Sequence, residues 1–190
     1  MNLWISSQHH NEEPLNTPSP PDSSSLQQNR SHPPTSLVAT LTNRTPTSNN
    51  TDPRITRYTN GTVDYNPALK SSRQLHQTNS PPQADLEILS KLLTDYRLFF
   101  ESNPVGSENA EITAALLGQN PKQLIFLDPT LTAISPTGEL LDRWGTPYIF
   151  HPLTSTEMDI RSLGPDRTLW TDDDLNLDLS ATEESLQLTR

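Results

Sequence analysis

Four aspartates are grouped near the C-terminal end of the sequence: Asp166, Asp172, Asp173 and Asp174. Carboxylates this close together repel one another, and a hard cation with oxygen ligands, such as Ca²⁺, relieves that repulsion. Gly164 and Pro165 can bend the chain so that Asp166 faces the later acids. The spacing does not match an EF-hand. The group is therefore a candidate cation site, with a solvated acidic turn as the alternative.

Other residue patterns give little support for catalysis. The sequence contains no phosphate-binding glycine loop, no G-x-S-x-G elbow and no H-E-x-x-H motif. His151 is the only histidine after residue 83, and we expect it at the surface end of a strand. Glu139 and Asp142 could pair as a glycosidase-like couple, but any acidic strand offers as much. We therefore predict that the protein is not an enzyme.

The composition sets further limits. Only 31% of the 190 residues are hydrophobic, against roughly 45–50% in an average globular chain. The formal net charge of −10 argues against nucleic-acid binding, because phosphate contacts need clustered Lys and Arg. The absence of cysteine excludes disulfides and zinc–thiolate sites. No apolar run approaches the ~18–20 residues that span a bilayer, and no signal peptide is recognisable.

The chain divides near residue 83 by composition. Residues 1–83 hold eleven of the eighteen prolines, with five acidic and six basic residues, whereas residues 84–190 hold eighteen acidic and seven basic residues. The first part has too few apolar residues to offset its chain entropy, so we predict a disordered tether over residues 1–83. A globular domain is predicted over residues 84–179 and a flexible tail over 180–190.

Two local features stand out within the predicted tether. Residues 56–65 could form a transient hairpin around Asn60-Gly61, with a two-residue turn that places Tyr58 opposite Val63 and Arg57 opposite Asp64. Four Asn-x-Ser/Thr sequons also occur and leave a glycosylated cell-surface stalk as an alternative, although chance explains them in so polar a segment: Asn29, Asn43, Asn49 and Asn60.

The second part predicts an α+β fold. Apolar residues recur at spacings of three and four from Leu86 to Phe100, which predicts an amphipathic helix over residues 84–102. A shorter helix is expected from about Asn109 to Leu117, with Gly118 as its stop. Strands are predicted at 123–127, 139–142, 147–151 and 157–162. Because no crossover helices separate them, we expect one small antiparallel sheet with the long helix packed on it.

One ordered set of motifs resembles a known family. D-x-W-G-x-P-Y occurs at Asp142 to Tyr148, S-x-G-x-D follows at Ser162 to Asp166, and an acidic loop closes the set at 172–174. This order is similar to the C-terminal globular head of the major pseudopilins of type II secretion and of type IV pilin-like proteins. The resemblance covers residues 86–178. It lacks the basic leader and long apolar helix with which a pseudopilin begins.

The resemblance implies a set of site residues. In that family the closing loop binds calcium, which carries here to Asp166, Asp172 and Asp174, with the carbonyl of Leu163 as a further ligand and Asp173 less certain. The turn residues hold the fold rather than a ligand. We expect Trp144 to fill the core, Gly145 to take an unusual backbone angle, and Pro147 to start the strand that contains Tyr148.

The sequence thus predicts a non-enzymatic, pseudopilin-like interaction or structural module with protein partners, linked to type II secretion or a pilus-like assembly. By the same resemblance we expect an extracytoplasmic location in the periplasm or at the cell surface. Either an upstream anchor is missing from this sequence, or the soluble head acts alone. The alternatives are a small hydrolase or carbohydrate-processing domain that uses acidic residues, and the glycosylated stalk.

Overall fold

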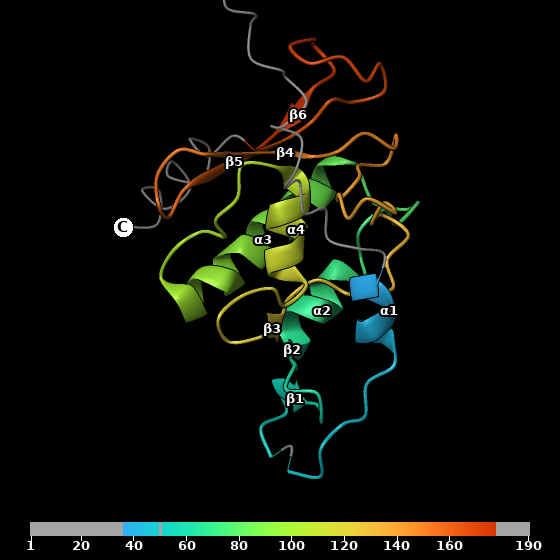
Figure 1. Ribbon diagram of the computed structural model, residues 1–190. Helices are drawn as coiled ribbons and strands as arrows, with labels where there is room; N and C mark the ends of the chain where they lie inside the picture. Colours follow the sequence, from blue (N-terminus) through green and yellow to red (C-terminus); the bar gives the residue numbers. More distant parts are fainter. Residues whose placement is uncertain (1–35, 50, 178–190) are drawn as a thin grey trace, which may run out of the picture. The chain divides into compact units, whose positions relative to one another are not determined.

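The computed structural model describes residues 36–49 and 51–177, and it confirms the α+β class (Figure 1). All of these residues belong to one compact unit. Its helices are α1 (Ser36–Thr42), α2 (Asn66–Ser72), α3 (Gln83–Phe100) and α4 (Asn109–Leu116). Its strands are β1 (Ile55–Arg57), β2 (Val63–Tyr65), β3 (Leu124–Ile125), β4 (Ile149–Pro152), β5 (Met158–Ser162) and β6 (Leu175–Asn176).

The strands form two small sheets in the described part of the chain, not the single antiparallel sheet expected. The first has the order β1-β2-β3, in which β2 pairs antiparallel with β1 and parallel with β3. The second has the order β4-β5-β6 and is antiparallel throughout. The single-sheet prediction failed because β3 pairs with β2, a strand from the segment predicted to be a tether. The expected strand at 139–142 forms only isolated bridges, Ile134 with Leu140 and Leu141 with Pro147.

Residues 36–83 contribute to the fold, which differs from the tether predicted over residues 1–83. Leu41, Val63, Leu69 and Leu75 lie in the same buried cluster as the apolar face of α3. The segment has few apolar residues, but these four and Ala68 are buried. Residues 1–35 of the predicted tether and the predicted tail at 180–190 lie outside the described residues.

The hairpin at residues 55–65 is part of this fold, in a different register from the one predicted. Arg57 lies opposite Val63 rather than Asp64. The N–H of Gly61 donates to the carbonyl of Tyr58, and Gly61 has φ +89, so the loop has three residues with a glycine in the left-handed region. In this register Val63 and Asp64 are both buried.

The two predicted helices lie where the sequence placed them. In α3, the residues that repeat at spacings of three and four are buried, and the helix ends at Phe100 with Glu101 in the left-handed region. Helix α4 begins with a capping box between Glu108 and Glu111, and Gly118 follows it with φ +100. No helix among the described residues has the length and apolar content needed to cross a membrane.

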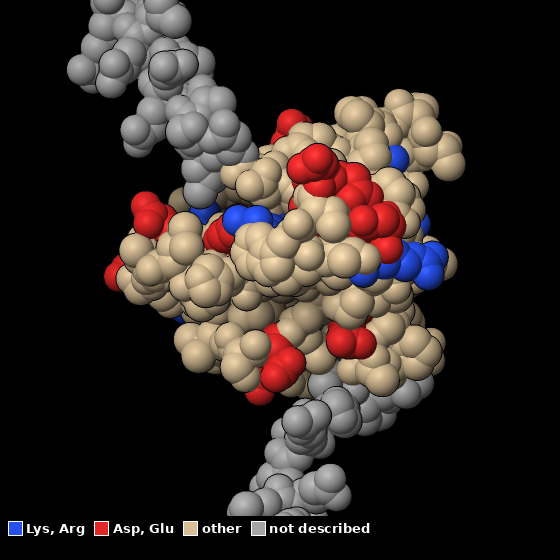
Figure 2. All heavy atoms as spheres, turned by 90° about the horizontal axis from the view of Figure 1, so that it is seen from above, with Lys and Arg blue, Asp and Glu red and all other residues tan. Residues whose placement is uncertain are grey.

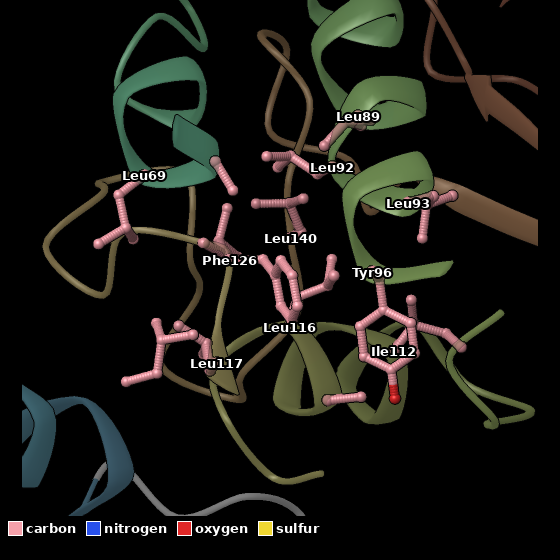
Figure 3. Packing of buried hydrophobic residues seen from close by; sticks show 14 of the residues in the cluster. Leu69, Leu89, Leu92, Leu93, Tyr96, Ile112, Leu116, Leu117, Phe126 and Leu140 are labelled. Atoms are coloured by element: carbon pink, nitrogen blue, oxygen red, sulfur yellow. The ribbon is translucent and has the colours of Figure 1, made fainter. Parts of the chain in front are cut away.

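The core lies between α2, α3, α4 and the chain around β3. Figure 3 shows Leu69 of α2, Leu92 of α3 and Leu116 of α4 around a shared interior that also contains Phe126. Phe126 is fully buried and packs against several other rings: Tyr65, Tyr96, Phe99 and Phe100. Phe126, rather than Trp144, is the aromatic centre of this core.

Trp144 lies outside the core, which corrects the prediction that it fills the interior. It is half-buried at the tip of a turn, where its backbone N–H donates to Oδ1 of Asp142 at 3.0 Å. Gly145 at the same turn has φ +83 and faces open space, in agreement with the expected backbone angle. Pro147 is half-buried and precedes β4 by two residues, while Tyr148 is buried in the core. Asp142, not Trp144, holds this turn.

Candidate functional site

The four aspartates lie in the loop between β5 and β6, residues 163–174, which we call the acidic loop. Two of their carboxylates accept hydrogen bonds from distant backbone N–H groups of the same loop. Asp173 Oδ2 accepts from the N–H of Asp166 at 3.0 Å, and Asp174 Oδ2 accepts from the N–H of Trp170 at 2.8 Å. These carboxylates therefore hold the backbone of the loop in place.

Asp173 and Asp172 differ in their surroundings although they are neighbours. The Thr171 hydroxyl donates to Asp173 Oδ1 at 2.6 Å, and this bond, with the one from the Asp166 N–H, holds the pKa of Asp173 below its usual value. Asp172 is exposed and accepts no hydrogen bond from a described residue. Asp172 thus adds a solvated negative charge to the loop without bracing it.

The predicted cation ligands make other contacts in this structure. Across residues 36–49 and 51–177, no group of three His, Asp or Glu side chains is arranged to hold a metal ion. Asp166 and Asp174 are engaged as backbone acceptors, and Leu163 lies half-buried directly after β5. Asp174 Oδ1 is buried and has no hydrogen-bond partner in the described part of the chain.

The backbone of the acidic loop is strained at two non-glycine residues. Arg167 has φ 60 and Trp170 has φ 70, both in the left-handed region. A bulky residue rarely adopts this conformation, which costs of order 1–3 kcal/mol and persists only where the surroundings enforce it. At Trp170 this restraint is the hydrogen bond from the backbone N–H of Trp170 to the carboxylate of Asp174. The hydrogen bond and the left-handed conformation together restrain the backbone at Trp170.

The side chain of Trp170 is a large exposed aromatic. Trp170 is 74% exposed, the most exposed aromatic ring among the described large hydrophobic residues. The guanidinium of Arg161 lies over its ring, 4.8 Å from the centroid, and Arg161 Nε in turn donates to Asp159 Oδ2 at 2.8 Å. These contacts link Asp159 and Arg161 on β5 to Trp170 in the acidic loop, and the indole ring of Trp170 is exposed to solvent.

Arg161 and Asp159 lie on the outward side of β5. Burial alternates along this strand, and Met158, Ile160 and Ser162 face inward. Pairing places Ile149 of β4 beside Arg161 and His151 beside Asp159. We call the surface formed by this outward side of the sheet and by the acidic loop the Trp170 face. Six acidic and two basic residues occur between positions 149 and 177.

Figure 2 looks onto the side of the unit that carries β4, β5 and β6, and shows acidic atoms in a run with basic atoms at one end. In the acidic loop, Asp166 and Asp172 are both exposed. A surface that combines an exposed indole with excess carboxylates suits contact with a partner that carries apolar and positively charged groups.

The residues considered for catalysis have other surroundings. Asp142 is buried, and both of its oxygens are used. The hydroxyls of Thr146 and Ser162 donate to Oδ2, each at 2.6 Å, and the backbone N–H of Thr146 donates to Oδ1 at 2.9 Å. Glu139 accepts from the hydroxyl of Thr137 at 2.8 Å. His151 is exposed in the edge strand β4, opposite Asp159. Asp142 therefore has a structural task at the turn rather than a free carboxylate.

Sequence reasoning missed Trp170 as a site residue. An isolated tryptophan in a polar loop has no motif, and only its place four residues before Asp174 could have indicated a capped turn. Among the sequons, Asn29 lies outside the described residues, whereas Asn43, Asn49 and Asn60 are exposed.

A scan of the sequence against protein-family models, a search of curated proteins and a search of solved structures each find no match. The site must therefore be judged by its own geometry.

Proposed function

We propose that this protein is a non-enzymatic interaction module that binds a protein partner through the Trp170 face. The observation that carries the proposal is Trp170 itself, exposed to 74%, restrained in a strained backbone conformation and stacked on Arg161. Tryptophan and arginine are enriched among the few interface residues that supply most of the binding energy. An anchor that is already ordered also loses less conformational entropy on binding.

The charge of the face selects the partner. Exposed Asp166 and Asp172 flank the indole in sequence, and the segment from 149 to 177 has an excess of acidic residues. A partner segment with Lys or Arg next to an apolar side chain matches this pattern, because opposite charges steer association and oppose wrong partners. Binding should weaken as salt rises, since screening shortens the reach of exposed charges to ~8 Å at 0.15 M.

Several finer expectations remain proposals that rest on the resemblance. These are the link to type II secretion or a pilus-like assembly, the extracytoplasmic location, and calcium binding in the acidic loop. For calcium, the buried and unpartnered Asp174 Oδ1 is the one observation in its favour. The hydrogen bonds that already occupy Asp166 and the other oxygen of Asp174 would have to rearrange around the ion.

A display library of random peptides, selected on the full chain, tests the proposed function. We expect the selected peptides to be enriched in Lys or Arg beside an aromatic or aliphatic residue. Trp170→Ala should weaken their binding about 30-fold, which corresponds to the ~2 kcal/mol of an interface hot spot. The matched control is Leu98→Ala on α3, because Leu98 is 70% exposed and outside the Trp170 face. Equal binding by the wild type and Trp170→Ala would refute the proposal.

A further inference from the structure

A second feature, independent of the Trp170 face, is a cavity of about 290 Å³ beside the β1–β2 hairpin. It forms where α1, the hairpin, α2 and the chain after β3 meet. Its walls combine apolar side chains with two arginine–aspartate pairs, and the residues that matter here are Leu41, Tyr58, Asp64, Leu69, Arg73 and Asp128. The volume is close to the lower end of the ~300–1,000 Å³ range of small-molecule sites.

The first ion pair is structural. Arg44 NH1 lies 2.6 Å from Asp64 Oδ1, and both side chains are only 7% exposed. The same guanidinium also donates to the Leu41 carbonyl and to the Thr62 hydroxyl, while Tyr58 donates its hydroxyl to Asp64 Oδ2 at 2.8 Å. With these bonds in place, the pair leaves little hydrogen-bonding capacity for a ligand.

The second ion pair is only partly used. Arg73 Nε donates to Asp128 Oδ2 at 2.5 Å, and the side chain of Arg73 is 63% exposed. Within the described part of the chain, neither NH1 nor NH2 of Arg73 has a hydrogen-bond acceptor. Asp128 is fixed from its other side by the N–H and hydroxyl of Thr130, at 2.9 and 2.7 Å. Arg73 thus presents free N–H donors at the cavity from a position that Asp128 anchors.

We propose that this cavity binds a small organic anion, a carboxylate or a phosphate ester, through NH1 and NH2 of Arg73. A guanidinium with two free nitrogens fits the two oxygens of either group. A cation would find no free carboxylate here, because the carboxylates of Asp64 and Asp128 already accept hydrogen bonds from arginines.

The test measures binding of inorganic phosphate and of succinate to the full chain by isothermal calorimetry and thermal unfolding, against sodium chloride at matched ionic strength. A ligand that binds only the folded state raises the melting temperature by mass action. A melting temperature that rises with phosphate alone points to a phosphorylated ligand, and one that rises with succinate alone points to a carboxylate. A rise with both anions points to a site that accepts either group. Each of these results supports the proposal.

Three variants make the test specific to Arg73. Arg73→Ala should weaken binding at least tenfold, and Arg73→Lys should weaken it less, because it keeps the charge but loses the planar fork. Lys70→Ala on α2, the helix that Arg73 directly follows, is the matched control, since Lys70 is exposed and outside the cavity lining. Circular dichroism checks that each variant is folded. Equal effects of phosphate, succinate and chloride, or equal losses in Arg73→Ala and Lys70→Ala, would overturn the proposal.

Discussion

Replacing Phe126 and Trp144 by alanine, one at a time, tests where the core of this protein lies. Phe126 is fully buried, and its ring centroid lies 5.4 Å from that of Tyr96 and 5.8 Å from that of Phe99. Truncation leaves a cavity among packed rings, and such changes cost about 3–5 kcal/mol. Trp144 is half-buried at a turn, so Trp144→Ala should cost only about 1–2 kcal/mol through lost apolar contact.

The assay is equilibrium unfolding in urea, followed by far-UV circular dichroism. Domains of this kind have ~5–15 kcal/mol of stability, so Phe126→Ala should be strongly destabilised or partly unfolded in buffer. Phe126→Leu keeps most of the apolar volume and should cost about 1–2 kcal/mol, which keeps the comparison measurable if the alanine variant does not fold. A loss in Trp144→Ala as large as that in Phe126→Ala would refute this assignment of the core.

Three further predictions concern charged groups. Burial lowers the pKa of His76, which lies near Asp85, Asp142 and Arg143, so the imidazole binds a proton more tightly in the unfolded chain than in the folded one. The free energy of unfolding should therefore fall as the pH drops below the unfolded pKa of ~6.5. His76→Asn should remove that part of the loss when urea unfolding is measured as a function of pH. A stability that is flat between pH 7 and 5 would contradict this. Arg44→Met leaves the Asp64 carboxylate buried without its arginine and should cost about 3–5 kcal/mol. Arg54→Met removes an exposed ion pair with Asp52 and should change the stability little, so similar losses for the two variants in urea unfolding would be the contrary result. Calcium binding in the acidic loop predicts that millimolar Ca²⁺ raises the melting temperature more than Mg²⁺ does and that Asp172→Asn reduces the effect, while equal shifts would indicate ionic screening alone.

The helices could be predicted from sequence because their signals are local. Spacings of three and four fixed α3, and the left-handed Gly118 marks the end of α4 as expected. The sheets could not, because pairing between β2 and β3 joins segments 61 residues apart and leaves no local pattern. The segment 36–83 was misjudged for a related reason: average composition does not record that five of its apolar residues, Leu41, Val63, Ala68, Leu69 and Leu75, are buried in one core.

In the acidic loop, too, the residue types could be predicted from the sequence, whereas the contacts between them could not. The acidic loop was found from its residue types, but their chemistry depends on which partner each carboxylate meets. Asp174 and Trp170 are four residues apart, and only the fold shows that one accepts the N–H of the other. The stacking of Arg161 on Trp170 likewise depends on how β5 and the acidic loop meet in space.

Site-specific photo-crosslinking in the source cells tests the central claim most directly. A photo-reactive amino acid in place of the exposed Thr168 of the acidic loop samples whatever touches the Trp170 face while Trp170 itself stays in place, and one in place of Leu98 samples an exposed point elsewhere. We expect one discrete protein adduct at position 168 and not at position 98, with the crosslink mapping to a basic segment of the partner. The adduct should disappear when Trp170 is also changed to Ala, or when Asp166 and Asp172 are both changed to Asn. No adduct at position 168, or the same adducts at both positions, would contradict the proposed interaction through the Trp170 face.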